Sequence, residues 1–318
     1  MTNNITSAAR DADTARYDGA VLLLPDKLRG AARTLTRDER ASAEEIRLRI
    51  GRPITVVTSR GECAVHGETV TKRDLDGLLD IATGASAHAA RDSVRAGYIT
   101  VRGGYRIGLC GTAVAQSGEI TGFRALSSAS VRIPHEARGV AGDIAPQLMR
   151  GGRVRSTLII SPPGGGKTTL LRDLIREVSD GDRALGLAPS RVALADERSE
   201  IAALLDGAPQ MEVGRNTDVL DACPKAAAVL MLLRAMNPQV IALDEITAPE
   251  DVDALTRAAN CGVSLIATAH ADSLDDLRRR AIYRPLLELG VFEKLVRIYR
   301  QGEERRYTVS DLAACPVN

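Results

Sequence analysis

The chain has 318 residues, enough for two domains that each bury an apolar core. Lys and Arg number 42 against 41 Asp and Glu, so the net charge of +1 offers no general attraction for nucleic acid or anionic lipid. The absence of Trp and the 3% of aromatic residues argue against base-stacking platforms. No apolar run is long enough to span a membrane, and the five cysteines form no CxxC pair. The sequence therefore predicts a soluble protein of a reducing cytoplasm.

Residues 1–19 are mostly polar and lack the basic and apolar regions of a secretory signal, so we expect a disordered tail. Residues 20–150 then mix two periodicities, apolar residues at helical intervals and apolar residues in alternation. The alternating segments flank Gly103-Gly104, which is typical of an antiparallel hairpin. We expect a smaller α+β domain here, with helices at 20–35, 72–90 and 139–149 and strands at 44–65, 97–114 and 121–133.

The remainder, residues 151–318, changes to short apolar runs that are separated by helical segments. Such alternation predicts a mostly parallel sheet that is covered by helices. Residues 294–312 add a closing β-hairpin around a Gln-Gly-Glu-Glu turn. The apolar runs are 156–161, 191–196, 239–245 and 263–270.

The apolar run that ends at Ile160 leads into Ser-Pro-Pro-Gly-Gly-Gly-Lys-Thr-Thr, which predicts a strand, a phosphate-binding loop and a helix. Glycines permit backbone N–H groups to approach phosphate oxygens, and the helix directs its positive end at the same anion. In this interpretation Lys167 bridges the β- and γ-phosphates of ATP, and the Thr168 hydroxyl is a ligand of Mg²⁺. Ser161 departs from the motif, which usually begins with Gly. The predicted nucleotide-binding residues are Pro163, Gly164, Gly165, Gly166, Lys167, Thr168 and Thr169.

A second apolar strand ends in Asp244 and Glu245. In a P-loop fold this strand lies beside the first, so we assign Asp244 to magnesium and Glu245 to the attacking water. A third strand ends with Thr268 and His270, where the carboxyl edge of the sheet should meet the γ-phosphate, which makes both residues candidate sensors. These strand ends predict an α/β fold with a RecA-like P-loop NTPase domain, preceded by the α+β domain.

A fourth strand, predicted at 192–195, is followed by Asp196 and Glu197. These acids either order the catalytic water and the magnesium shell or form an ordinary charged exit from the strand. A basic triplet at 278–280 lies on a predicted helix and fits a solvated surface. The candidate catalytic residues at the strand ends are Glu197, Glu245, Thr268 and His270.

Several further segments lie outside the generic ATPase motifs. Between Leu22 and Leu312 the chain carries LP..LR, EEIRLRIGRP, GYITVRGGYRIGLCG, GGGKTTLLRD, DERSEIA, NPQVIALDE and TAHA. With these motifs the chain resembles the stage III sporulation protein AA family, whose relatives are the type II and type IV secretion and pilus-retraction ATPases. Because the motifs extend beyond the ATPase core, the resemblance points to a family and not merely to a fold.

The resemblance implies a hexameric ring in which the amino-terminal domain of one copy lends arginines to the ATP site of the next. Arg124 and Arg132 are the first candidates, ahead of Arg106, within the β-rich part of that domain. An arginine that acts in trans is worth about 10³ to 10⁵ in turnover, so an isolated subunit should be a poor ATPase. The family's catalytic glutamate matches Glu245, its acidic box matches Glu197, and its histidine box matches Thr268 and His270.

The resemblance also implies a role in spore formation. The ring would be cytoplasmic in the mother cell and peripheral at the outer forespore membrane. There it would energise or assemble a secretion-like channel between mother cell and forespore. Its partners would be the membrane-embedded products of the same sporulation operon.

Two other functions fit the same core. One is a nucleic-acid-stimulated RecA-like motor or an RNA-binding ATPase. The near-neutral charge and the few aromatic residues disfavour it, so we expect no stable nucleic-acid binding. The other is a nucleotide-dependent scaffold with negligible turnover, which the presence of both Asp244 and Glu245 disfavours.

Overall fold

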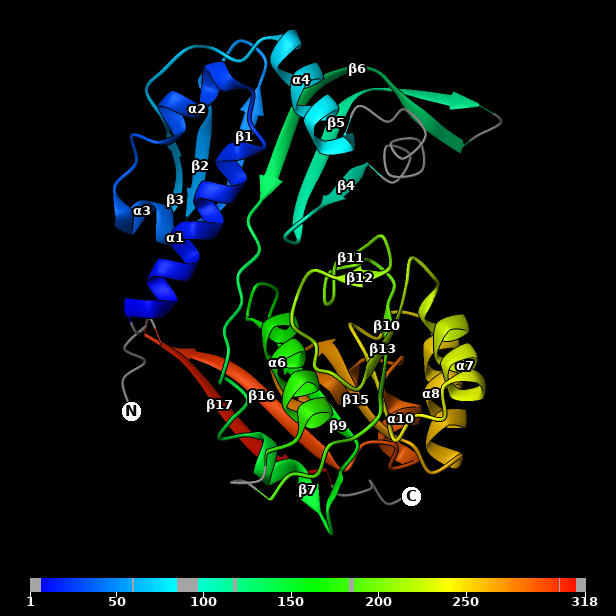
Figure 1. Cartoon of the computed structure of the whole chain (residues 1–318). Coiled ribbons are helices and arrows are strands. Elements are labelled where there is room, and N and C mark those ends of the chain that lie inside the picture. The colour runs from blue at the N-terminus through cyan, green and yellow to red at the C-terminus, as the bar shows by residue number, and fades with distance from the viewer. Residues whose placement is uncertain are drawn as a thin grey trace. The chain divides into compact units, whose positions relative to one another are not determined.

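The computed structural model describes residues 7–58, 60–84, 97–116, 119–182, 186–302 and 304–312 (Figure 1). The chain divides into two compact units, Met1–His135 and Glu136–Asn318, which we call unit 1 and unit 2. No described helix is both long and apolar enough to cross a membrane.

The boundary between the units lies after His135 and not near residue 150, where the sequence suggested it. Ala141 and Leu148 explain the difference, because they are buried in the unit 2 core together with helix α6 (Lys167–Asp180). The helix predicted at 139–149 is replaced by turns and a single 3₁₀ turn, Ala145–Leu148. Two glycines and a proline in this stretch disfavour a longer helix.

Unit 1 is built on one antiparallel sheet with the strand order β3-β2-β1-β6-β5-β4. Its helices enclose one apolar core with the sheet. The predicted helix at 72–90 ends at Thr83, because Gly84 adopts a left-handed cap, and residues 85–96 lie outside the described part. The strands are β1 Ala43–Arg49, β2 Thr55–Thr58, β3 Gly61–Ala64, β4 Tyr98–Val101, β5 Tyr105–Gln116 and β6 Glu119–Arg132, and the helices are α1 Ser7–Leu22, α2 Asp26–Ala32, α3 Arg37–Ala41 and α4 Lys72–Thr83.

The prediction of a disordered tail is wrong for residues 7–19, which form most of α1. Tyr17 and Ala20 are fully buried, and the Tyr17 hydroxyl donates a hydrogen bond to the carbonyl of Ala32 over 2.8 Å. Only a narrow stripe of this helix is apolar, among many charged residues. Composition therefore suggested a solvated tail, whereas packing against unit 1 determines the structure.

Unit 2 contains a seven-stranded sheet with the order β13-β10-β14-β15-β9-β16-β17. The first six strands run parallel and β17 runs antiparallel to β16, so the mostly parallel sheet and the closing hairpin are confirmed. The strands are β7 Met149–Arg150, β8 Arg153–Val154, β9 Thr157–Ser161, β10 Val192–Asp196, β11 Leu204–Leu205, β12 Ala208–Pro209, β13 Thr217–Asp221, β14 Val240–Leu243, β15 Ser264–His270, β16 Lys294–Gln301 and β17 Glu304–Asp311. The remaining helices are α7 Lys225–Ala235, α8 Pro249–Asn260, α9 Leu274–Arg279 and α10 Arg284–Glu288.

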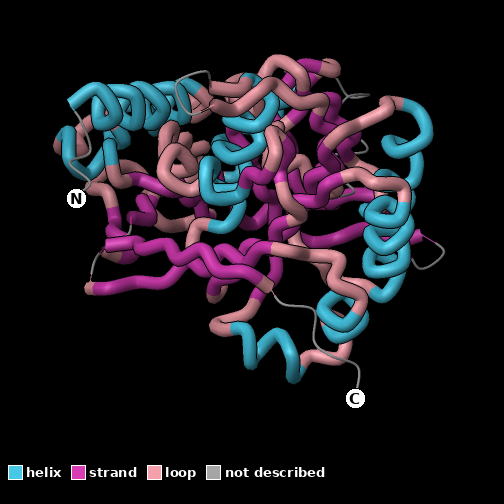
Figure 2. Tube along the Cα trace, turned by 90° about the horizontal axis from the view of Figure 1, so that it is seen from below, coloured by secondary structure: helices cyan, strands magenta, loops and turns pink. Residues whose placement is uncertain are grey.

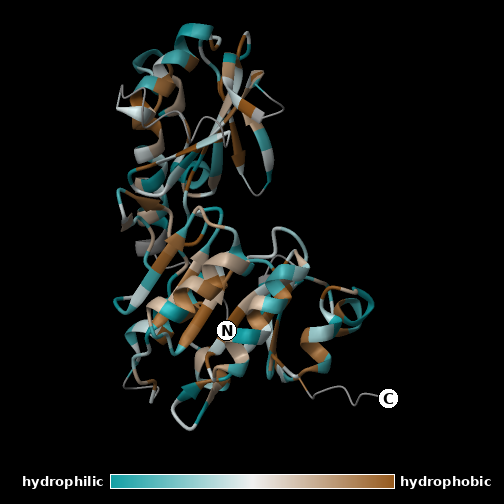
Figure 3. Cartoon of the chain, turned by 90° about the vertical axis from the view of Figure 1, so that its right-hand side faces the viewer, coloured by the Kyte–Doolittle hydropathy of each residue, from teal (hydrophilic) through white to brown (hydrophobic). Residues whose placement is uncertain are grey.

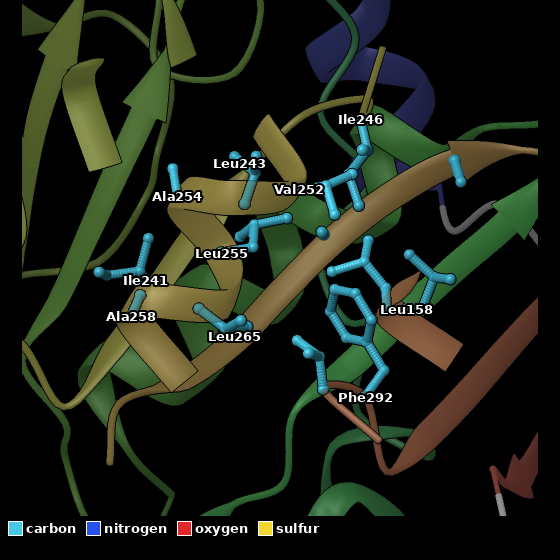
Figure 4. Packing of buried hydrophobic residues seen from close by; sticks show 14 of the residues in the cluster. Leu158, Ile241, Leu243, Ile246, Val252, Ala254, Leu255, Ala258, Leu265 and Phe292 are labelled. Atoms are coloured by element: carbon cyan, nitrogen blue, oxygen red, sulfur yellow. The ribbon is translucent and has the colours of Figure 1, made fainter. Parts of the chain in front are cut away.

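Each face of the unit 2 sheet buries its own apolar cluster, because side chains alternate along the strands. Ile159 of β9 faces α6, whereas its neighbours Leu158 and Ile160 belong to the cluster on the side of α7 and α8. Figure 4 shows side chains of α8 projecting toward Leu243 and Leu265 of the sheet. Helices α7 and α8 accordingly lie at the right-hand edge of Figure 2, outside the strands, and the strands of this sheet are mostly hydrophobic in Figure 3.

Replacing Tyr17 by Ala should lower the free energy of unfolding by about 3 kcal/mol, because it removes a buried ring and the hydrogen bond to Ala32. Leu22→Ala is the matched control, since Leu22 lies on the same helix but is 55% exposed, and it should cost less than about 0.5 kcal/mol. Urea unfolding followed by circular dichroism measures both variants. Equally small effects would show that α1 does not pack as described.

Candidate nucleotide-binding site

The phosphate loop begins where β9 ends and closes at Gly166, the residue before α6. Gly164 and Gly166 have φ angles of +70° and +99°, a region that disfavours residues with side chains. Because α6 starts directly after Gly166, its positive end lies at this loop. The strand, loop and helix thus follow one another as the sequence predicts.

Ser161, the departure from the usual motif, lies inside this loop. Its side chain is fully buried, and its hydroxyl donates a hydrogen bond to the Pro162 carbonyl over 2.8 Å. A Cβ atom added to Gly165 would lie only 2.3 Å from Ser161 Oγ. The serine therefore occupies space that a side chain at position 165 would need, and the pair Ser161 and Gly165 is sterically complementary.

Lys167 lies at the centre of the site and is only 6% exposed. Its Nζ is 2.7 Å from Nδ1 of His270, and Nε2 of His270 is 3.1 Å from Oε1 of Glu245. Because an ammonium group only donates, Nδ1 accepts and Nε2–H donates to the carboxylate, which fixes the tautomer of the ring. The three side chains therefore form one chain of contacts across the ends of adjacent strands.

Burial lowers the pKa of Lys167, while the carboxylates of Asp244 and Glu245 oppose this shift by favouring the ammonium form. The ammonium has lost most of its water and has a histidine as its hydrogen-bond acceptor. A group in this state gains more from an anionic ligand than a solvated lysine does. The electrostatics around Lys167 would therefore suit an anionic ligand.

Asp244 is held through both carboxylate oxygens. The hydroxyl of Thr168 donates to Oδ2 over 3.1 Å, and the hydroxyl of Thr268 donates to Oδ1 over 2.6 Å. Thr268 is fully buried, and its hydroxyl also accepts the backbone N–H of Glu245 over 3.0 Å. Thr268 therefore positions the two acids at the end of β14.

The contact between Thr168 and Asp244 also bears on magnesium. Mg²⁺ prefers hard oxygen ligands, and it usually takes one or two carboxylates together with water and substrate phosphates. A hydroxyl and a carboxylate oxygen 3.1 Å apart, at the mouth of a phosphate loop, fit this small ligand set. Thr168 and Asp244 are thus the residues that would hold the metal.

Asp196 secures the loop that follows β10. Its carboxylate is 1% exposed and accepts the backbone N–H groups of Glu200, Ile201 and Ala202 at distances from 2.8 to 3.2 Å. Burial raises the pKa of this carboxyl, and the N–H groups oppose the shift. Arg172 of α6 binds the same loop by donating to the carbonyls of Glu200 and Ile201.

Glu197 lies beside a lysine that sequence reasoning missed. Its Oε2 is 3.2 Å from Nζ of Lys225, which is 8% exposed and also lies 3.0 Å from Thr247 Oγ1 and 3.9 Å from Asp251 Oδ2. Lys225 is the first residue of α7, where the positive end of the helix dipole disfavours a cation. We therefore attribute its position to the attraction of the nearby acids Glu197 and Asp251. The sequence does show a lysine directly after Pro224, at the start of an Ala/Leu-rich helix, and this unusual position for a cation could have indicated a nearby acid.

The arginines that the sequence singled out lie in unit 1. Arg132 Nε donates to Glu45 Oε1 over 3.0 Å, and Arg106 stacks on the ring of Tyr98 at 3.6 Å from its centroid. Arg124 is exposed on β6. The described site of unit 2 consists of residues at the ends of its strands and at the start of α6.

The chain matches a known family and a curated relative over most of its length. Residues 21–309 match the family model described as Sporulation stage III, protein AA. The chain is 37% identical over 278 residues to "Stage III sporulation protein AA" of Bacillus subtilis (strain 168), a match that covers 87% of this chain and 89% of that protein.

Two solved structures share the fold. The ATPase DotB of Legionella pneumophila aligns with a TM-score of 0.58 at 18% identity, over 88% of this chain and 79% of that chain. The pilus retraction motor PilT, solved with bound ADP, aligns with a TM-score of 0.56 at 17% identity, over 85% of this chain and 79% of that chain.

Replacing Lys225 by Met should lower the free energy of unfolding by about 2 to 3 kcal/mol, because Asp251 is 4% exposed and loses its cation. Lys294→Met is the matched control, since Lys294 pairs with Asp311, which is 69% exposed, and such surface pairs contribute at most about 1 kcal/mol. Urea unfolding of both variants measures the difference. Equal stabilities would remove Lys225 from its role in holding these acids.

Proposed function

The chain belongs to the stage III sporulation protein AA family, and on this basis we propose that it is a magnesium-dependent, secretion-type ATPase that acts in sporulation. The fold that it shares with the DotB ATPase and the PilT motor supports this proposal. The observation that carries it is the convergence of Lys167, Thr168, Asp244, Glu245 and His270 at the ends of adjacent strands.

These side chains have distinct roles in the hydrolysis of ATP to ADP and phosphate. Lys167 donates to the β- and γ-phosphate oxygens. Thr168 and Asp244 would hold Mg²⁺, and the metal would offset the charge of the triphosphate. Glu245 orients the attacking water and accepts its proton.

His270 connects the phosphate to the general base. In the structure the His270 ring accepts from Lys167 and donates to Glu245. When a triphosphate takes the Lys167 ammonium, the ring loses this donor and is able to reorient toward the γ-phosphate. Glu245 thereby loses a partner at the moment when it is needed for water.

We further propose that six copies form a ring in which unit 1 of one copy completes the site of the next. Arg132 lines a hollow of about 460 Å³ on the unit 1 sheet together with Arg47, Arg49 and Arg106, with one carboxylate among them. Arg124 lies outside this hollow. This concentration of positive charge favours Arg132 as the arginine that meets the neighbouring triphosphate.

The family supports a place for this ring in spore formation. We place it in the mother-cell cytoplasm, bound peripherally to the outer forespore membrane. There it energises or assembles a channel between mother cell and forespore, through contacts with membrane-embedded products of the same operon.

Glu245→Gln should bind ATP normally but lower turnover about 10² to 10⁴-fold, because an amide does not accept the proton of the water. Lys167→Ala should abolish nucleotide binding, since it removes the buried ammonium. Glu250→Gln, an exposed acid on α8, is the matched control and should match the unsubstituted protein. The binding of a fluorescent ATP analogue and the release of phosphate are measured on the same samples of each variant.

Full turnover by Glu245→Gln would remove this residue from its role, and retained binding by Lys167→Ala would contradict the phosphate-loop assignment. Turnover that appears only when DNA or RNA is added would favour the nucleic-acid motor. Binding without turnover in the assembled protein would favour the scaffold.

The ring predicts that the ATPase rate per subunit rises with protein concentration. Arg132→Ala should lower this rate about 10³-fold while nucleotide binding is retained, whereas Arg124→Ala should have a small effect. Mixing Arg132→Ala with Lys167→Ala should restore activity, because the second variant supplies Arg132 to sites that bind ATP. A monomeric enzyme with a concentration-independent rate would refute the ring.

A further inference from the structure

The hairpin of β16 and β17 extends past the end of its neighbour β9. Lys294 to Arg297 of β16 pair with Thr157 to Ile160 of β9, but β16 continues to Gln301 while β9 ends at Ser161. Four residues therefore project beyond the last pair, a distance of about 13 Å at 3.3 Å per residue. This overhang lies level with the phosphate loop, and Figure 1 shows the hairpin in orange and red beside α6 and β9.

The overhang places an arginine on the phosphate loop. Cζ of Arg305 lies 3.3 Å from the position that a Cβ at Gly166 would take, and its Nε and Nη1 lie 3.4 and 3.5 Å from it. The guanidinium thus packs against the last glycine before α6. A side chain at position 166 would meet both this arginine and the strain of a φ of +99°.

A second arginine accompanies the first. Arg300 is the direct cross-strand partner of Arg305, and directly opposed residues of an antiparallel pair project from the same face. The same face carries Ile298 and Tyr307, which pack in the cluster beneath α6. Like charges that face each other in this way are destabilising. No hydrogen bond or ion pair joins either guanidinium to another residue in the described part of the chain.

We propose that Arg305 and Arg300 bind the α-phosphate of the nucleotide in the same subunit. Lys167 and Thr168 face Asp244 and His270, so the γ-phosphate and the metal belong on the β14 and β15 side of β9. The hairpin lies on the other side of β9. This side is therefore left for the phosphate closest to the nucleoside. An anion at this position also relieves the repulsion between the two guanidinium groups.

This contact rests on the proposed function, because it requires that the phosphate loop binds a nucleotide. It differs from an arginine in trans in one consequence. The α-phosphate is present in both ADP and ATP, so the pair strengthens the binding of both nucleotides and leaves the chemical step unchanged.

The test is the binding of fluorescent ADP to the full chain at low salt, where exposed charges are least screened. Arg305→Ala should weaken binding about tenfold, and the double change with Arg300→Ala should weaken it further. ATP should lose affinity by the same factor as ADP, because both nucleotides carry the α-phosphate. Arg297→Ala is the matched control, because it removes the same charge from the opposite face of the same strand, and it should change affinity less than about twofold.

Displacement by inorganic tripolyphosphate separates phosphate contact from contact with the base. In the double variant, the inhibition constant of tripolyphosphate should rise by the same factor as the dissociation constant of ADP. An unchanged constant for tripolyphosphate, or equal ADP binding by the double variant and Arg297→Ala, would overturn the assignment. If the unsubstituted protein binds no nucleotide, the proposed function fails together with this inference. Thermal unfolding of each variant confirms that a loss of affinity does not come from a loss of fold.

Discussion

The parallel register of β14, β15 and β9 is the constraint on which the site depends. Leu243 is paired with Ala267, and His270 is paired with Ser161, so the strands end at one edge. Nζ of Lys167 therefore lies 2.7 Å from Nδ1 of His270, although 103 positions separate the two residues in the sequence. The apolar clusters on the two faces hold this register, because a slip by one residue would move every core side chain to the wrong face. Core packing thus sets the geometry of the charged edge.

Charges at this edge are arranged in two sets. The inner set surrounds Lys167, whose burial is opposed by the carboxylates of Asp244 and Glu245 and whose ammonium donates to His270. The outer set holds the loops. Asp196 binds backbone N–H groups of the loop after β10, and Lys225 joins Glu197 to the segment after β14. Removal of one member of the outer set therefore acts on the ligand site through the backbone.

Local patterns predicted the strands and the phosphate loop of unit 2, because alternation, glycine content and the spacing of Lys167 are properties of short segments. They did not predict α1, whose burial depends on contacts with distant residues, or β13, a short edge strand rich in polar residues. Lys225 and Arg305 were missed for the same reason. A lone lysine or arginine has no periodicity, and its importance lies in the element that folds beside it.

Arginines of the same subunit and an arginine of a neighbouring copy would have different roles at the site. Arg300 and Arg305 would meet the phosphate that ADP and ATP have in common, so they would add affinity without distinguishing the two nucleotides. Arg132 of a neighbouring copy would meet charge that develops at the γ-phosphate, so it adds turnover only where a neighbour is present. A subunit outside the ring would then retain its nucleotide without hydrolysing it. The free energy of hydrolysis would then be released only at an interface between two copies.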